Sequence, residues 1–526
     1  MFRNLLIHFL CSACLVFSAS AQTSQPETET EPEPAEMIRL EVALDRALAN
    51  NLGLATQRFA VANAEDDIEV QEAVFDVELF GNTNYSESVA AARTSGLDDA
   101  DIPESETRNA SIGFDQRLST GATVTVDSGL RRRESNNNSV RNPDYFGDVG
   151  ISVNQPLLKD AWKKINLAPI ARARVSRDIS LFELRSDVLD LLRESELAYW
   201  DLAYAKADRM LIASSIELAT NLLEENSERQ RLGLTTSLEV LQAENELNDR
   251  QEDLLQAERE IFEALDDLLD LMGATSFLQP IEKDLEVAAL PQQIPVLRPI
   301  EVVLRDAIDT DLEASAQERA IEVQKINRLL AEDEMRPDLS LVAGVAYSGR
   351  DTAGDEAFSG ALGRDGRDWN VGLQLRFPWG FREAKARLRQ AERDLERETW
   401  LLYELKQDKA LATRTAWRAV DTSLRRITLT QKSLELNQEA FEQERARYGS
   451  GLVAYRNVLE AQRDFDSARR DRLSAVIETM RAQVNLSRID GTILDRNGFT
   501  WERLDELATP PELDQHPLAE DLQSDS

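Results

Sequence analysis

The residues that most often carry enzyme chemistry are almost absent from this chain. Among 526 residues there are two histidines, His8 and His516, and two cysteines, Cys11 and Cys14. A chain with so little imidazole and thiol lacks the usual general base and the usual zinc ligands. The sequence has no glycine-rich phosphate loop and no Gly-x-Ser-x-Gly motif. Carboxylates are so abundant that no pair of them stands out, so we expect no enzyme activity, no cofactor and no metal site.

The charge balance excludes one class of partner. Asp and Glu number 96 against 60 Lys and Arg, which gives a formal net charge of −36. Such an acidic chain repels phosphate backbones, so we expect no nucleic-acid partner. Aromatic residues make up only 6% and charged residues 30% of the chain. This mixture suits long, solvated helices better than a compact core.

The first 21 residues have the features of a secretory signal. Arg3 provides the positive start, an apolar stretch follows, and Ala19-Ser20-Ala21 is a small-residue cleavage site. The alternative is a lipoprotein signal acylated at Cys14, although Cys11-Ser12-Ala13-Cys14 lacks the usual aliphatic residue three before the cysteine. Cleavage after Ala21 predicts an exported protein whose mature chain contains no cysteine and therefore no disulfide.

Three blocks of sequence recur in the same order, which indicates a duplicated structural unit. The block from Gly233-Leu234 to Ala243 matches the block from Gly451-Leu452 to Ala461. The other two matches pair Val149–Pro156 with Val371–Pro378, and Leu40–Leu52 with Ile300–Leu312. Each repeat must therefore be interpreted as one module.

Each module contains stretches in which apolar and polar residues alternate. A period of two with one apolar side predicts strands that face two different media. A tight turn at Ser119-Thr120-Gly121 alternates with long polar loops, which is typical of outer-membrane barrels. We predict six strands per chain; the alternative keeps four and leaves Ala110–Leu130 as a hairpin outside the membrane. The predicted strands lie near Val77–Tyr85, Ala110–Leu118, Ala122–Leu130, Val149–Gln155, Leu339–Tyr347 and Val371–Phe377.

The strands must be carried by long helices. From about Asn166 to Leu232 there is no glycine, and apolar residues recur at spacings of three and four, which predicts one helix roughly 100 Å long. A return helix is expected from Thr236 to Met272. In the second repeat the long helix is expected from Arg382 to Tyr448, with a return helix ending near Gly491. No later stretch approaches the ~20 apolar residues of a membrane-spanning helix.

These patterns divide the chain into six segments. The divisions are the signal at 1–21, a disordered acidic leader at 22–36, a first repeat at 37–273, a linker at 274–298, a second repeat at 299–494 and a C-terminal tail at 495–526.

With its doubled turn-and-helix blocks and its paired strand ends, the chain resembles the TolC-type outer-membrane efflux protein family, also called outer membrane factors. The resemblance extends from about Met37 to Leu494 and includes Tyr199-Trp200 with its counterpart Ala416-Trp417. It implies an α+β membrane protein, a homotrimer whose strands close one β-barrel that continues into a periplasmic α-helical barrel. The strands themselves favour such an assembly, because so few strands cannot close alone and open edges are not tolerated in lipid.

The resemblance also implies a function and partners. The expected function is a passive exit duct through the outer membrane, serving a tripartite efflux or type I secretion system and gated at its periplasmic tip. The implied partners are a periplasmic adaptor (membrane fusion) protein, an inner-membrane transporter and outer-membrane lipid. The competing hypothesis is a periplasmic or surface coiled-coil scaffold without a pore, which would need no strands.

The resemblance assigns candidate site residues to the two turns. The periplasmic tip would be formed by the turns at Gly233-Leu234 and Gly451-Leu452. The family's acidic ring corresponds here to an amide and an acid, and its gate arginine falls at Val453, close to Arg456. For Glu239 and Glu460 the alternative is ordinary solvated helix surface, and for Tyr448 it is simple packing at the turn. The candidate gate and tunnel-lining residues are Glu239, Gln242, Tyr448, Asn457 and Glu460.

Overall fold

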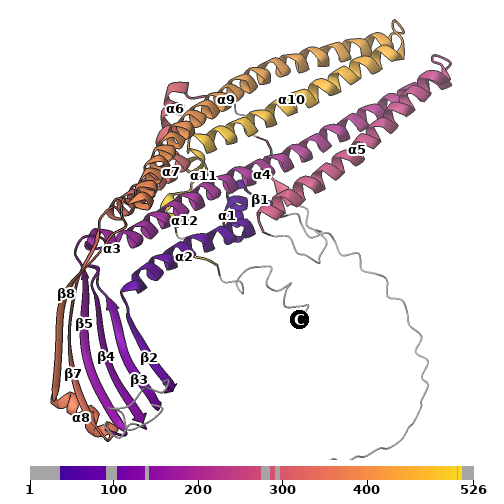
Figure 1. The fold of residues 1–526 in the computed structure, drawn as a ribbon. Helices are drawn as coiled ribbons and strands as arrows, with labels where there is room; N and C mark the ends of the chain where they lie inside the picture. The colour runs from indigo at the N-terminus through magenta and orange to yellow at the C-terminus, as the bar shows by residue number, and fades with distance from the viewer. Residues whose placement is uncertain are drawn as a thin grey trace, which may run out of the picture.

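The computed structural model describes residues 36–89, 104–136, 141–273, 285–290, 296–505 and 508–511. The expected signal, most of the acidic leader, Cys14 and His516 lie outside these residues. The described chain is elongated, with a sheet at one end and two long helical hairpins extending from it (Figure 1).

Six strands form one antiparallel sheet in the order β2-β3-β4-β5-β7-β8. The number of strands per chain is therefore as predicted, and β3 and β4 lie inside the sheet rather than in a separate hairpin. Strands β5 and β7 join the two repeats, and β2 and β8 are left as open edges. The strands are β2 (Val77–Val89), β3 (Glu104–Arg117), β4 (Thr123–Ser135), β5 (Asp144–Pro156), β7 (Asp338–Asp351) and β8 (Gly366–Arg376).

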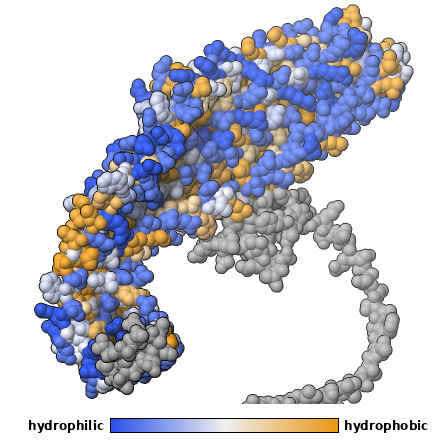
Figure 2. Space-filling view, in the orientation of Figure 1, coloured by the Kyte–Doolittle hydropathy of each residue, from blue (hydrophilic) through white to orange (hydrophobic). Residues whose placement is uncertain are grey.

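The pairing register sorts the side chains of the sheet into two faces. Directly paired residues share a face, and one such row across all six strands is Leu79, Phe114, Val126, Ile151, Val345 and Trp369. The neighbouring row, on the other face, is Glu78, Asp115, Thr125, Ser152, Gly344 and Asn370. One face is thus apolar and solvent-exposed, and the other is polar. Figure 2 shows hydrophobic side chains gathered over the strands, whereas the hairpins are mostly hydrophilic.

The helices follow the duplicated plan. The first hairpin consists of α4 (Ala168–Arg231) and α5 (Ser237–Leu271), and the second of α9 (Arg382–Gly449) and α10 (Tyr455–Ile489). Helix α2 (Leu52–Glu72) lies against the long helix α4, and α7 (Leu312–Asp333) lies against both α4 and α9. Among the described residues, no helix has the length and apolarity needed to cross a membrane. The shorter elements are α1 (Leu40–Asn50), a 3₁₀ turn at Ala73–Phe75, α3 (Lys163–Asn166), α6 (Ile300–Asp309), α11 (Ile493–Asn497) and α12 (Trp501–Asp505).

Two elements differ from the sequence-based expectation. Strand β1 (Glu36–Ile38), at the boundary between the expected leader and the first repeat, was not predicted; it pairs in parallel with β6 (Leu285–Val287) from the linker. The connection between β7 and β8, expected to be a loop, contains helix α8 (Gly354–Gly363). Both elements depend on contacts with residues distant in sequence, so local patterns did not reveal them.

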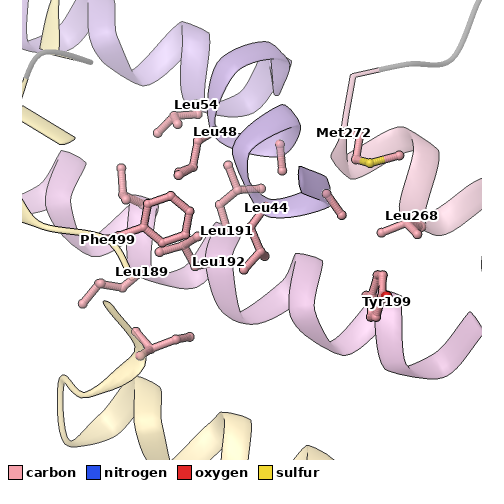
Figure 3. Packing of buried hydrophobic residues seen from close by; sticks show 14 of the residues in the cluster. Leu44, Leu48, Leu54, Leu189, Leu191, Leu192, Tyr199, Leu268, Met272 and Phe499 are labelled. Atoms are coloured by element: carbon pink, nitrogen blue, oxygen red, sulfur yellow. The ribbon is translucent and has the colours of Figure 1, made fainter. Parts of the chain in front are cut away.

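A core near the middle of the molecule ties the first hairpin to the short elements. It collects buried side chains from α1, α2, α4, α5, β6 and α11 (Figure 3). Tyr199 of α4 is fully buried there; its hydroxyl donates to the carbonyl of Ile38 at 3.0 Å and accepts from the Ala288 N–H at 2.9 Å. One phenol thus ties β1 and the residue after β6 to the long helix.

Replacing Tyr199 with phenylalanine is expected to destabilise the folded protein by ~1–3 kcal/mol. The ring would still fill its site, but a buried carbonyl and a buried N–H would lose their shared partner. The midpoint of urea unfolding followed by circular dichroism measures the loss. Tyr204→Phe on the same helix, where the tyrosine is half-buried, is the matched control; equal midpoints for both variants would contradict the prediction.

Candidate functional site: the tip of the two helical hairpins

Both hairpins turn in the same way at the tip. Gly233 and Gly451 each adopt a φ of 74°, a left-handed conformation in which glycine has no steric penalty. The N–H of Leu234 bonds to the carbonyl of Arg229 at 2.8 Å, and the N–H of Leu452 bonds to that of Arg447 at 2.9 Å. These bonds close the C-terminal helix ends in a Schellman motif. The two leucines project from the tip and are exposed.

The predicted lining residues occupy equivalent positions after the two turns. Glu239 and Gln242 are the third and sixth residues of α5, and Asn457 and Glu460 are the third and sixth of α10. Their surroundings differ, since the pair on α5 is half-buried and the pair on α10 is exposed.

Arg456 does not join the two hairpins. Its guanidinium lies 3.2 Å from the carboxylate of Glu460, one turn along the same helix, and both side chains are exposed. Exposed pairs of this kind contribute little to stability. Of the expected gate residues on α10, none therefore connects to the first hairpin in this conformation.

Tyr448, by contrast, is an inter-hairpin contact. It is 4% exposed, and its hydroxyl donates to the side-chain oxygen of Asn226 on α4. The guanidinium of Arg229 lies 4.5 Å from the centre of the Tyr448 ring, and the Tyr455 ring centre is 5.6 Å away. Burial raises the pKa of Tyr448, so its phenol keeps the proton that it donates. The residue is thus inside the structure and binds the second hairpin to the first.

An apolar cluster surrounds this contact. All four hairpin helices contribute to it, so the two hairpins pack against each other close to the tip. Its buried members are Leu222, Ala243, Phe441, Tyr448, Tyr455, Val458 and Leu459.

Farther from the tip, the joint between α5 and α10 is ionic. Glu246 of α5 is 2% exposed and accepts hydrogen bonds from Arg250 at 2.8 Å and from Arg463 of α10 at 2.6 Å. Asp466 of α10 is also buried; it accepts a hydrogen bond from Ser215 of α4 at 2.8 Å and lies 3.5 Å from Arg250. The hydrogen bonds to the Glu246 carboxylate raise the pKa of Arg463. This group is called the ionic joint below.

The ionic joint is one step in a polar seam that runs along both hairpins. In four further ion pairs the arginine comes from the second hairpin and the carboxylate from the first. These pairs are Arg445–Glu225 at 3.8 Å, Arg470–Asp253 at 3.0 Å, Arg481–Asp201 at 2.9 Å and Arg488–Asp190 at 2.8 Å. Polar contacts of this kind can exchange for water, so the hairpins are joined by a surface that tolerates separation.

Sequence reasoning singled out Tyr448, whose role at the gate stays a prediction, but not its partners. Asn226, Glu246 and Asp466 were missed because each is one polar residue among many. A signal was available, since Ala243, Glu246 and Arg250 continue the three-and-four spacing of a buried seam. A charged residue on such a seam must have a partner opposite.

Comparisons with known proteins agree with this architecture. The family model described as outer membrane efflux protein matches residues 123–274 and 305–492. No curated protein matches the chain in sequence.

Several solved structures share the fold. The outer membrane protein VceC of Vibrio cholerae is 18% identical, with 86% of this chain and 96% of that chain covered and a TM-score of 0.63. The CmeC outer membrane channel of Campylobacter jejuni is 15% identical, with 94% and 98% covered and a TM-score of 0.65. The MtrE outer membrane channel of Neisseria gonorrhoeae, in its open state, is 17% identical, with 90% and 97% covered and a TM-score of 0.55. Because the family model matches more than half of its length and the duplicated fold agrees, the chain belongs to the outer membrane efflux protein family.

Proposed function

We propose that three copies of this chain form a passive exit duct through the outer membrane, opened at its periplasmic tip. The observation that carries the proposal is the sheet of six strands with one apolar face, one polar face and two open edges. An isolated sheet of this kind would leave the N–H and C=O groups of β2 and β8 unpaired in lipid. Pairing β8 of one copy with β2 of the next removes both edges and closes a barrel of eighteen strands, within the range of such barrels.

The helices support the same assembly. Both hairpins also keep large apolar side chains exposed, such as Leu255 and Phe262 on α5 and Leu429 and Leu436 on α9. A neighbouring copy on each side would cover these residues. The helical part of the trimer would then form a hollow cylinder below the barrel.

The tip of the hairpins would be the gate. In the closed form Tyr448 and the ionic joint hold the second hairpin against the first. A periplasmic adaptor protein would dock on the exposed leucines of the two turns, and an inner-membrane transporter would deliver the cargo. Opening requires the second hairpin to move away, exchanging polar contacts of the seam for water or adaptor contacts. CmeC and MtrE, which share the fold, are described as outer membrane channels.

The scaffold hypothesis has less support. A coiled-coil scaffold needs no strands, whereas this chain has a six-stranded sheet whose apolar face would stay exposed to water. Lipid is the medium that such a face fits.

The assembly can be tested by cryo-electron microscopy of the protein purified from outer membranes. We expect a threefold particle with eighteen strands in the barrel. A stable monomer, or a trimer in which β2 and β8 of neighbouring copies do not pair, would contradict the proposal.

Glu460→Lys is expected to lower the cation preference of single channels in planar bilayers. If the exposed face of α10 lines the entrance, the substitution replaces three carboxylates by three ammonium groups at one height in the trimer. Asp309→Lys changes the net charge equally on the short helix α6, away from the tip, and is the control. Unchanged selectivity in Glu460→Lys, or an equal change in both variants, would mean that Glu460 does not line the entrance.

A further inference from the structure

Helix α8 lies flat on the sheet, held by two glycines. Gly147 of β5 and Gly349 of β7 are paired neighbours in the register. A Cβ atom on Gly349 would lie 2.2 Å from the carbonyl oxygen of Ala357, and one on Gly147 would lie 3.0 Å from the same atom. A side chain at Gly349 would collide with the helix backbone, and one at Gly147 would press tightly against it. Ala357 and Ala361, one turn apart, are accordingly buried against the sheet.

The register decides which face of the sheet α8 covers. Gly147 lies two residues before Val149, and Gly349 lies two residues after Tyr347, so both glycines belong to the apolar face. The Arg364 guanidinium at the end of α8 lies 5.1 Å from the ring centre of Tyr347, on the same face. The helix is therefore outside the barrel, on the side that would face lipid.

The position of α8 along the strands corresponds to one edge of the lipid belt. Ten residues separate Gly349 from Leu339 at the helix-proximal end of β7, about 33 Å along a strand. A strand tilt of roughly 40° reduces this to about 25 Å in height, the usual height of the apolar band. Gly349 is at the end away from the hairpins, so α8 would lie at the outer boundary between acyl chains and headgroups.

The side chains of α8 fit this boundary. Phe358 and Leu362, one turn apart, are 39% and 63% exposed. Ser359 and Glu356 are exposed on the neighbouring side of the helix, away from the sheet. An apolar row beside a polar row is the pattern of helices that lie in a membrane interface.

We propose that α8 is an interfacial anchor that binds the outer leaflet of the membrane, with acyl chains against Phe358 and Leu362. The apolar row of α8 continues the apolar face of the sheet, which identifies lipid as its partner. The inference rests on the proposed function, because the sheet must span the outer membrane for α8 to meet lipid.

Spin labelling tests the proposal directly. Cys11 and Cys14 are the chain's cysteines, and both lie in the expected signal, so single cysteines introduced elsewhere can be labelled selectively in the mature protein. Phe358→Cys, Leu362→Cys, Glu356→Cys and Ser359→Cys would each carry a nitroxide in trimers reconstituted into liposomes. For each nitroxide, the rate of collision with oxygen, which concentrates in lipid, is compared with the rate of collision with a water-soluble nickel chelate. We expect the oxygen-to-nickel ratio at 358 and 362 to exceed that at 356 and 359 several-fold.

Two sheet positions separate failure of this inference from failure of the proposed function. Leu373→Cys on the apolar face should report lipid, and Gln374→Cys on the polar face should report water. If 373 reports lipid but 358 and 362 match 356, the anchor is refuted and the duct stands. If 373 also reports water, the sheet is not in the bilayer and the proposed function fails. Adding Gly349→Val, whose side chain would collide with the α8 backbone, should abolish the lipid signature at 358 and preserve it at 373.

Discussion

Replacing Leu373 by arginine is expected to remove almost all of the assembled trimer from the outer membrane. Leu373 is 70% exposed in the single chain and lies near the middle of the apolar face of β8, paired with Leu341. An arginine on a lipid-facing strand costs about 2–4 kcal/mol at the midplane and less toward the interfaces, and Leu373 lies between the midplane and the helix-proximal boundary. Three copies in one barrel multiply this cost, and β8 is also the edge that must pair with the neighbouring copy. The measurement is the amount of heat-modifiable trimer in the outer-membrane fraction.

The adjacent residue provides the matched control. Gln374 is on the same strand but on the polar face, so Gln374→Arg directs the same side chain into the lumen. We expect it to assemble at close to the normal level. Equal loss in both variants would mean that β8 is sensitive to any arginine, and equal assembly would mean that the apolar face does not contact lipid.

The sheet could be predicted from sequence because a strand with one side toward lipid and the other toward water has apolar and polar residues in alternation. Ile112 and Ile151 are exposed apolar residues of this alternating pattern, and their period of two is visible without a structure. Helix α8 could not be predicted in the same way. Its ten residues are few for a periodic signal, and its position depends on Gly147, which is two hundred residues away in the chain.

The candidate site was predictable only in part, for a similar reason. The two glycine turns are local features, and their recurrence identified the tip. The partners across the hairpins are a property of tertiary packing. Nothing near Tyr448 in sequence indicates that its hydroxyl meets Asn226, and nothing near Glu246 indicates that Arg463 lies opposite. Charged residues are so frequent in this chain that only its burial distinguishes Glu246 from the many solvated carboxylates.

Burial also indicates which contact most strongly controls the closed state. Tyr448 contributes one hydrogen bond to Asn226, whereas Glu246 is a buried charge that accepts hydrogen bonds from arginines on two helices. Neutralising it would leave both guanidinium groups without their shared carboxylate. Arg463 is 57% exposed and can be solvated, so the cost is less than the 3–5 kcal/mol of a fully buried pair. We estimate about 2 kcal/mol, which corresponds to a ~30-fold change in the ratio of closed to open forms.

Glu246→Gln is therefore expected to raise the open probability of the channel without affecting its assembly. The amide keeps the shape of the side chain but not the charge that attracts Arg463, so α10 separates from α5 more readily. Conductance in planar bilayers would show frequent open events in the variant, and the amount of heat-modifiable trimer would stay normal. Glu244→Gln, exposed two residues away on the same helix, should behave like the unmodified protein. If Glu246→Gln channels stay as closed as those of the control, the ionic joint stabilises the hairpins but does not hold the gate. In that case Tyr448 and the apolar cluster would be the remaining restraints on opening.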